Sequence, residues 1–344
     1  MGDVAFSPSL VRSGDDGRGL IRIGHPLLDA YLELVAARGR PNTLLAHAYD
    51  LKVFFTVIDR DPVDVAPVDV LAFIAEQRQP RRASNVVRIE DGEVGLSART
   101  IKRRLATIAG LYDYLVVRGD VTANPVPRGL ATRRGGQRVV RGVPLIRAPR
   151  TLPRIVDPTS IDAFTAALRT QRDRAMIDAM LLGGLRRCEV LGLRFTDINA
   201  GERRVFIAEG KGGHERIVPI SSRFFTALAA YLTEERPDRG VTDRVFVVLK
   251  GPRRGQPLSA AGLDEIVAGA QRRAGIEHLT CHQLRHTCFT RLREAGMALE
   301  AIQAQAGHRS IESTRLYLHL ANDWLAGEYR RASEAIDAQQ IGGW

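Results

Sequence analysis

One stretch of this chain, residues 127–154, constrains its fold more than any other. It contains four prolines, four glycines and eight arginines, and it has no acidic residue. Proline lacks a backbone donor and glycine favours turns, so the stretch forms neither one long helix nor a central strand. We therefore expect an arginine-rich linker. The linker separates a first domain (25–126) from a second domain (155–344). Residues 1–24 are expected to form an N-terminal tail before the first domain.

The net charge of +11 is concentrated in this linker. Residues 1–126 carry 16 basic and 16 acidic side chains, the linker carries 8 and none, and residues 155–344 carry 26 and 23. Such an excess favours a polyanionic partner, and a run of arginines without counter-charges suits the phosphates of DNA. The alternative is a charged linker that is only solvated. The candidate DNA contacts in the linker are Arg128, Arg133, Arg134, Arg138 and Arg141.

The first domain has the apolar periodicity of helices. The expected helices span 26–37, 43–58, 68–77 and 97–117. Ser97 is a candidate N-cap of the fourth helix, which has an apolar side and a basic start. Its candidate DNA-binding residues are Arg99, Lys102, Arg103 and Arg104. A basic helix face is more often only solvated, so both interpretations stay open. Residues 79–96 are polar and irregular, and we assign them no role.

The second domain has a mixed pattern. Helices are expected over 160–168, 173–182, 224–235, 259–274, 281–295 and 311–320, with a last one ending near residue 338. Strands over 203–208 and 215–220 flank a glycine-rich hairpin tip, and 244–249 is a further expected strand. The predicted fold class is therefore mainly α with a small β-sheet, with an α+β second domain.

Membrane and secreted classes are not indicated. No apolar run approaches the roughly 18 residues that a membrane span needs, and the first 20 residues have no apolar core of a secretory signal. We therefore expect a soluble, cytoplasmic protein. Its three cysteines, Cys188, Cys281 and Cys288, have no CxxC spacing, so they indicate neither a disulfide framework nor a structural zinc module.

Lys211 stands out because this chain rarely uses lysine. Only four of its 50 basic residues are lysines, and Lys211 lies between glycines at the expected hairpin tip. Arginine does not release a proton near neutral pH, whereas lysine can, so the position suggests proton transfer. The alternative is an ordinary surface lysine in a turn.

A second candidate group is His282, Arg285 and His286, which share one helix face at positions i, i+3 and i+4. Arginine offers a fork to phosphate and histidine donates a hydrogen bond or a proton, so an anion site is favoured. The HxxxH spacing also suggests zinc, but Gln283 replaces the glutamate of HExxH and an arginine stands between the histidines. We therefore expect no metal.

Two further fragments are ambiguous by themselves. Arg186 and Glu189 have the i, i+3 spacing of a surface ion pair. Gly307 is expected to end a short helix, which places His308 at a corner and Tyr317 two turns into the next helix. A tyrosine among leucines is most often a packed core residue.

In their order and spacing these fragments resemble the tyrosine recombinase, or phage integrase, family. Residues 184–189 (Gly-Leu-Arg-Arg-Cys-Glu) resemble its first arginine box, and 210–212 its β-hairpin lysine. Residues 282–286 resemble its second box and 307–308 its third. Tyr317 follows His308 by nine residues, where the family carries its nucleophile.

The likeness spans roughly residues 155–335 and, more weakly, the first domain, where Asn124-Pro125 resembles the end of a core-binding domain. Ala306 precedes Gly307 where the family usually has leucine, which bears on packing. The resemblance implies a helical SAM-like core-binding domain followed by a catalytic domain. It also implies a site-specific recombinase, as used in DNA integration, excision, transposition or resolution by mobile elements and chromosomes.

The resemblance further implies roles for the site residues. Arg186, Arg285 and His308 would bind a DNA phosphate, and Tyr317 would attack it to form a 3′-phosphotyrosine link. His282 would act as general base and Lys211 would protonate the leaving 5′-oxygen, without metal, ATP or any other cofactor. Glu189 and His286 would be supporting residues.

The implied partners are double-stranded DNA at core recombination sites and three further copies of the chain, forming a tetramer on paired sites. The C-terminal helix would be exchanged between protomers, and an accessory protein or partner recombinase is a further expectation. Two alternatives remain at this point: a type IB topoisomerase-like enzyme that relaxes one duplex, and a catalytically silent DNA-binding regulator.

Overall fold

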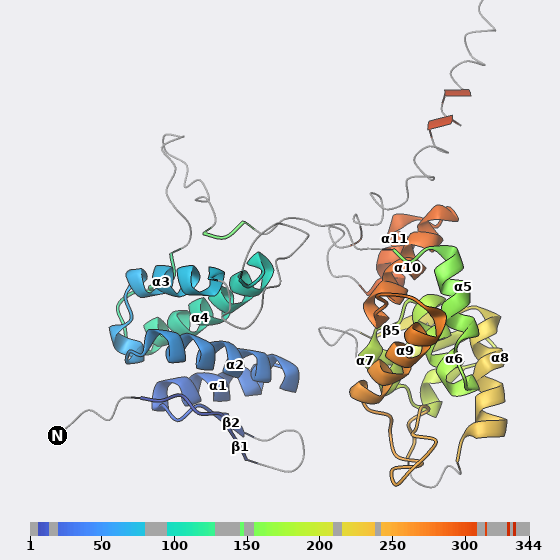
Figure 1. The fold of residues 1–344 in the computed structure, drawn as a ribbon, viewed down its shortest axis with the longest axis horizontal. Helices are drawn as coiled ribbons and strands as arrows, with labels where there is room; N and C mark the ends of the chain where they lie inside the picture. The colour runs from blue at the N-terminus through green and yellow to red at the C-terminus, as the bar shows by residue number, and fades with distance from the viewer. Residues whose placement is uncertain are drawn as a thin grey trace, which may run out of the picture. The chain divides into compact units, whose positions relative to one another are not determined.

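The computed structural model forms two compact units, Met1–Arg150 and Thr151–Trp344. It describes residues 6–13, 20–79, 95–127, 145–147, 155–208, 215–237, 242–307, 314, 329–330 and 333–334. Most of these residues are helical, and they include a two-stranded and a three-stranded sheet (Figure 1). The predicted fold class, mainly α with a small sheet, is confirmed. Most of the predicted linker lies outside the described residues, so its exact bounds stay a prediction.

The described part of unit 1 is built on four helices: α1 (Pro26–Arg38), α2 (Pro41–Ile58), α3 (Pro67–Arg78) and α4 (Ala98–Arg118). The first three begin at a proline, where a missing N–H leaves no helical hydrogen bond unmade. A short 3₁₀ turn, η1 (Pro62–Asp64), precedes α3. Ser97 caps α4 as predicted, its Oγ accepting a hydrogen bond from the Thr100 amide at 3.1 Å.

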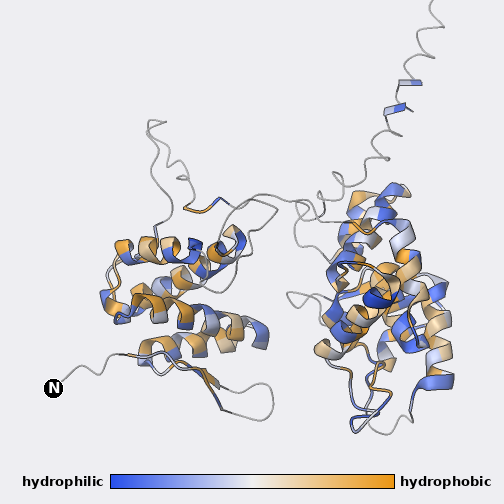
Figure 2. Ribbon diagram, viewed as in Figure 1, coloured by the Kyte–Doolittle hydropathy of each residue, from blue (hydrophilic) through white to orange (hydrophobic). Residues whose placement is uncertain are grey.

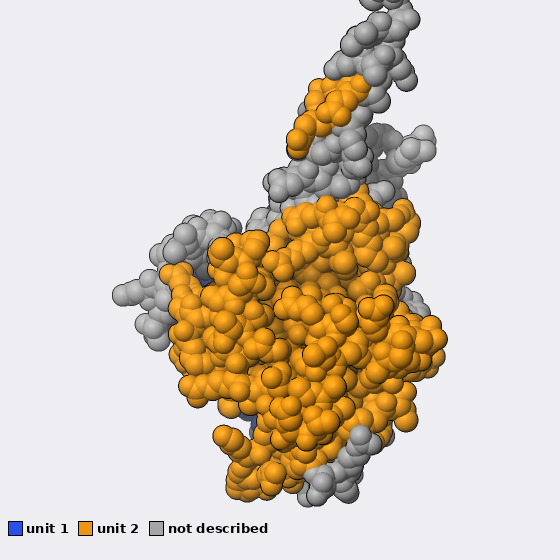
Figure 3. All heavy atoms as spheres, turned by 90° about the vertical axis from the view of Figure 1, so that its right-hand side faces the viewer, with its two compact units in different colours: residues 1–150 blue, residues 151–344 orange. Residues whose placement is uncertain are grey.

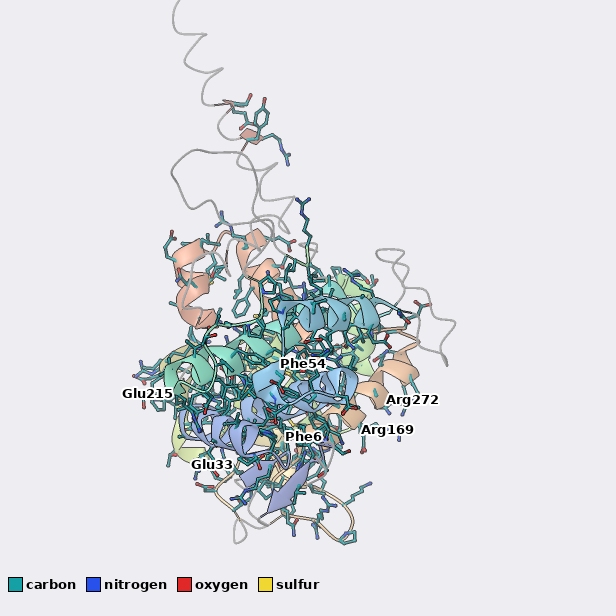
Figure 4. All side chains as sticks on the ribbon, turned by 90° about the vertical axis from the view of Figure 1, so that its left-hand side faces the viewer. Phe6, Glu33, Phe54, Arg169, Glu215 and Arg272 are labelled. Atoms are coloured by element: carbon teal, nitrogen blue, oxygen red, sulfur yellow. The ribbon has the colours of Figure 1, made fainter. Side chains whose placement is uncertain are left out.

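The core of unit 1 is made by the facing sides of these helices, where hydrophobic residues gather (Figure 2). Phe54, which Figure 4 labels, packs edge-to-face against Phe55 and Phe73 with ring centroids 5.0 Å apart in both pairs. The buried Tyr112 hydroxyl donates to the Pro62 carbonyl at 2.9 Å. This bond joins α4 to η1 and satisfies the polar end of an otherwise apolar side chain.

The segment expected as an N-terminal tail contributes to this core. Strand β1 (Val11–Ser13) pairs antiparallel with β2 (Leu20–Arg22), and β2 lies against α1 and α2. Ile21 and Ile23 are buried, and the Phe6 ring lies 6.2 Å from that of Phe55. The helices shield these apolar side chains from water, so the described part of the segment packs against the rest of unit 1.

Unit 2 surrounds α6 (Gln171–Leu181), whose side chains from Ala175 to Leu181 are all buried. Its other helical elements are α5 (Pro158–Ala166), α7 (Arg187–Gly192), η2 (Phe195–Asp197), α8 (Ser222–Ala230), the π-helical turn η3 (Tyr231–Glu235), α9 (Ala260–Ala274), α10 (Cys281–Glu294) and α11 (Leu299–Ala306). Figure 3 shows this unit as closely packed spheres, from the side that carries α8. None of the helices in the described ranges is long and apolar enough to cross a membrane.

The sheet of unit 2 is antiparallel in the order β3 (Ile198–Asn199), β4 (Arg204–Ile207) and β5 (Arg216–Pro219). Val205 pairs with Val218, and both side chains are fully buried. Strands β4 and β5 therefore form the hairpin predicted around Lys211, whose tip (209–214) lies outside the described residues. The helices expected beyond residue 310 also lie largely outside them.

The prediction of a strand over 244–249 is wrong. The structure has only isolated bridges in this described segment, Arg194 to Arg244 and Val247 to Pro257. Its backbone bonds to two other segments, from the Val245 amide to the Leu193 carbonyl and from the Val248 amide to the Gln256 carbonyl, both at 2.9 Å. Two side chains add to these bonds: the Arg236 guanidinium donates to the Arg244 carbonyl at 2.9 Å, and the Tyr231 hydroxyl donates to the Val245 carbonyl at 3.1 Å. Each backbone pairing is too short to form a strand, and apolar alternation alone did not reveal this.

Candidate active site

Arg285 points from α10 into the interior of unit 2, and only 2% of its side chain is exposed. Its guanidinium donates to the Gly184 carbonyl and, at 2.6 Å, to the Ala306 carbonyl. The guanidinium also lies over the Phe289 ring, 4.8 Å from the centroid. Three segments thus fix Arg285: its own helix, the turn before α7 and the end of α11.

Gly184 is a glycine for two structural reasons. Its φ is +67°, a left-handed conformation that other residues rarely adopt. A Cβ at this position would also lie 2.7 Å from Phe289 Cε1, well inside van der Waals contact. The glycine therefore lets the turn before α7 approach α10, so that its carbonyl reaches Arg285.

Arg186 is the N-cap residue of α7, and its side chain is 20% exposed. It donates from Nη1 to Glu189 Oε1 at 2.8 Å and from Nη2 to the Ala306 carbonyl at 3.2 Å. Arg186 and Arg285 therefore meet at one carbonyl oxygen, at the C-terminal end of α11. Their positive charges are brought together from two distant parts of the sequence.

Glu189 is the carboxylate that holds this cluster. Its side chain is fully buried and accepts from the Arg186 amide at 2.8 Å, from Arg186 Nη1, and from both terminal nitrogens of Arg216 at 2.9 and 2.8 Å. Arg285 Nη1 lies 4.0 Å from Oε2. Burial raises the pKa of Glu189, but the hydrogen bonds from Arg216 and Arg186 outweigh it and lower the pKa to about 2. The i, i+3 pair is thus a buried site feature and not a surface ion pair.

Arg216, at the start of β5, is a site residue that the sequence analysis missed. It is 9% exposed, and besides Glu189 it binds the Gln305 carbonyl, with an Nε to O distance of 2.9 Å. One signal was available. Residues i, i+2 and i+4 share one face of a strand, so Arg216 lies on the same face as the buried Val218 and Ile220.

His282 and His286 lie in the first turns of α10 with their Nε2 atoms 2.9 Å apart, so one ring donates to the other. His282 is exposed and His286 half-buried. Burial, together with the neighbouring His282 and Arg285, lowers the pKa of His286 to about 4, so His286 is neutral at pH 7. The Gln283 side chain accepts from the Thr280 amide at 2.8 Å in a capping box, a role that glutamine and glutamate both fill.

The remaining predicted catalytic residues, Lys211, His308 and Tyr317, lie outside the described residues. So do the linker arginines Arg128, Arg133, Arg134, Arg138 and Arg141. Within the described residues, no group of three or more His, Cys, Asp or Glu side chains comes together as a metal site.

The basic start of α4 divides into two pairs. Arg99 and Lys102 are exposed. Arg103 is half-exposed and pairs with the buried Asp50, which also accepts from the Thr107 hydroxyl at 3.0 Å. Arg104 is 13% exposed, with its Nε 3.7 Å from Asp50 Oδ1, and it donates to Gln77. Arg104 therefore contributes to the packing of unit 1 as well as to its surface charge.

Comparisons with known proteins agree with this organisation. Residues 154–323 match the phage integrase family, and residues 28–119 match the phage integrase N-terminal SAM-like domain. The tyrosine recombinase XerC of Pelobacter propionicus is 30% identical over 302 residues, covering 85% of this chain and 89% of that protein. The tyrosine recombinase XerD of Listeria monocytogenes is 28% identical over 321 residues, covering 89% and 97%.

Solved structures share the fold. The integrase of the Tn1549 transposon, in complex with transposon right end DNA, has a TM-score of 0.65 at 18% identity, covering 89% of this chain and 99% of that one. A lambda integrase dimer bound to a COC′ core site has a TM-score of 0.61 at 18% identity, covering 85% and 94%.

Proposed function

Because this chain belongs to the phage integrase family of tyrosine recombinases and is a site-specific DNA recombinase, we propose that Arg186 and Arg285 hold one DNA phosphate for attack by Tyr317. The observation that carries the proposal is the meeting of both guanidinium groups at the Ala306 carbonyl. Together with Arg216, three guanidinium groups share the single carboxylate of Glu189. Positive charge is therefore in excess in the described part of the site, as a phosphate requires.

In the proposed reaction, the Tyr317 oxygen forms a bond to phosphorus and the bond to the 5′-oxygen breaks. The ordinary pKa of tyrosine is about 10, so the phenol needs a base, and His282 takes this proton. Lys211 gives a proton to the departing 5′-oxygen. Arg186, Arg285 and His308 stabilise the charge that develops on the other phosphate oxygens. The exposure of His282 supports this role, because it leaves the ring accessible to bound DNA.

The 3′-phosphotyrosine link keeps the energy of the broken bond. A 5′-hydroxyl from a second strand can then reverse the step and join new partners without ATP or metal. We further propose that Arg99, Lys102 and the arginine-rich linker contact DNA phosphates during this reaction. The exposure of Arg99 and Lys102 supports this part of the proposal.

We propose that the enzyme acts as a tetramer on paired core sites, in the cytoplasm, with an accessory protein or partner recombinase setting direction. The C-terminal segment carries a stripe at helical spacing that suits protomer exchange: Leu318, Leu325, Tyr329, Ala332 and Ile336. Tyr329, the member whose side chain is described, is 74% exposed in the single chain. That exposure supports burial against a neighbouring protomer.

A nicked duplex tests this function. A recognition site is first selected from random-sequence duplexes by binding to the chain, and a nick is then placed beside each candidate scissile phosphate so that the cleaved strand diffuses away. Wild type should accumulate a covalent adduct on one such duplex, whereas Tyr317→Phe should bind it with equal affinity and form none. A wild-type protein that binds and never forms the adduct would favour the silent regulator.

DNA substrates that carry the selected recognition site distinguish recombination from strand relaxation. A recombinase should produce joined products between two duplexes that carry the site. An enzyme that relaxes supercoiled DNA yet yields no exchanged product would instead support the type IB topoisomerase-like alternative, which the comparisons do not favour.

A further inference from the structure

Arg216 binds the buried carboxylate of Glu189, to which Arg186 also donates hydrogen bonds. We propose that Arg216 is a positioning residue for strand transfer, acting through Glu189 and the end of α11 on the guanidinium groups of Arg186 and Arg285. The inference rests on the proposed function and deepens it, because it assigns a role to a residue that does not touch the phosphate.

The geometry of the Arg216–Glu189 pair supports this role. Both terminal nitrogens of Arg216 bind the two oxygens of Glu189, at 2.9 and 2.8 Å, in a fork-to-fork arrangement. This arrangement fixes the plane of the carboxylate. The same two oxygens also accept from Arg186 Nη1 and from the Arg186 amide. Arg216 thereby determines where Glu189 directs its bonds to Arg186.

The charge balance of the site also supports a positioning role for Arg216. A carboxylate neutralises about one guanidinium, and in this site Arg216 takes both of its oxygens. Because this one carboxylate is shared among three guanidinium groups, a net positive charge remains on Arg186 and Arg285 for a phosphate. Without Arg216, Glu189 would act as the counter-ion of Arg186 and Arg285 alone, and it would compete with the phosphate for them.

Arg216 is also connected to α11, which packs against both α10 and β5 (Figure 1). Arg216 Nε donates to the Gln305 carbonyl at 2.9 Å, next to the Ala306 carbonyl that Arg186 and Arg285 share. A Cβ on Gly307 would lie 3.1 Å from Arg216 Cδ, so glycine admits the arginine stem here. Arg216 therefore fixes the shared carbonyl as well as the carboxylate.

The burial of the Arg216–Glu189 pair is consistent with a positioning role. Arg216 and Glu189 are 9% and 0% exposed, so both charges are removed from water. A pair of hydrophobic residues of similar volume is often as stable as a buried ion pair, or more so. An ion pair at this position therefore suits a site that uses its charge and geometry.

Arg216 also follows Lys211 by five residues on the predicted hairpin. It could thus act on the lysine, but its hydrogen bonds run to α7 and α11. We therefore assign its effect to the arginine pair. A duplex with sulfur in place of the departing 5′-oxygen separates the two routes, because a thiolate leaves without needing a proton.

The test measures single-turnover cleavage and DNA affinity on the nicked duplex, with either oxygen or sulfur at the 5′-position. Arg216→Met should cleave about 10- to 100-fold more slowly, the range seen for side chains that orient a directly acting group such as a metal ligand. Its DNA affinity should change less than threefold. Arg216→Lys should recover part of the rate. Sulfur should rescue Lys211→Ala but not Arg216→Met; rescue of both to the same degree would overturn the assignment to the arginine pair.

Two further variants separate positioning from folding. Arg172 is a matched control, since it is also buried and paired with a carboxylate, but its partners are Asp173 and the Val247 carbonyl. Arg172→Met should lower the melting temperature and leave the rate per folded molecule unchanged. The double variant Arg216→Met/Glu189→Leu should regain stability and stay slow. Recovery of its rate along with its stability would refute the positioning role, while absence of any wild-type adduct would instead refute the proposed function.

Discussion

Replacing Glu189 with glutamine removes the carboxylate that three guanidinium groups share. The pKa of Glu189 is about 2, against 4.5 for an ordinary glutamate. Each pH unit between these values corresponds to about 1.4 kcal/mol, so the charged form contributes about 3 kcal/mol to stability at neutral pH. This agrees with the roughly 3–5 kcal/mol lost when one partner of a buried pair is removed. We expect Glu189→Gln to lower the free energy of unfolding by about 3 kcal/mol at pH 7.

The pH dependence gives this prediction its sign. A pKa lowered in the folded state stabilises fully above the unfolded value of 4.5, and the stabilisation is lost as the pH falls toward 2. The difference between wild type and Glu189→Gln should therefore stay constant from pH 7 to about 5.5. Between pH 4.5 and 3.5 this difference should shrink by about 1 kcal/mol. Wild type loses the contribution of the charged Glu189 over this range, whereas Glu189→Gln has no such charge to lose.

The assay is urea unfolding of the full chain, read by hydrogen exchange in peptides of α7 and α10 so that unit 2 is followed separately. Glu202→Gln is the control, because Glu202 is an exposed glutamate of the same unit. It should change stability by less than about 0.5 kcal/mol. A Glu189→Gln difference that is absent at pH 7, or that widens as the pH falls, would refute the reasoning.

Three further predictions concern other parts of the chain. Gly184→Ala should destabilise unit 2 by about 2 kcal/mol or more, since φ is +67° and the Phe289 ring occupies the space; an unchanged melting temperature would contradict this. Ser97→Ala should cost about 1 kcal/mol in urea unfolding, because the Thr100 amide loses its cap; no loss would mean that the cap is replaced. Changing the linker residues Arg128, Arg133, Arg134, Arg138 and Arg141 to glutamine should reduce the salt slope of DNA binding by about 0.9 per lost phosphate contact; an unchanged slope would leave the linker only solvated.

The features predictable from sequence were those set by neighbouring residues. Ser97 caps the helix that follows it, as predicted. The helix expected from residue 26 begins at Pro26, whereas the helices expected from 43 and 68 begin slightly earlier, at Pro41 and Pro67. The spacing on α10 likewise placed Arg285 and the two histidines together. Each of these signals needs only a few consecutive positions.

The features that were missed depend on contacts between distant residues. Arg216 joins Glu189 and Gln305, which lie far apart in the sequence, and no local spacing connects the three. The segment expected as a strand over 244–249 forms only isolated bridges, one of them to the distant Arg194. In the same way, Phe6 and Ile23 pack on helices of unit 1 that follow them in the sequence. Tertiary contacts of this kind outweigh local propensity.

The site of the covalent link tests the central claim most directly. Trypsin should release residues 316–330 from the trapped adduct, and fragmentation by mass spectrometry distinguishes Tyr317 from Tyr329 within this one peptide. We predict a nucleotide on Tyr317 in wild type, and its loss in an Arg285→Met variant that still folds and binds the duplex. A nucleotide on Tyr329 or any other residue, or an undiminished adduct in Arg285→Met, would contradict the claim.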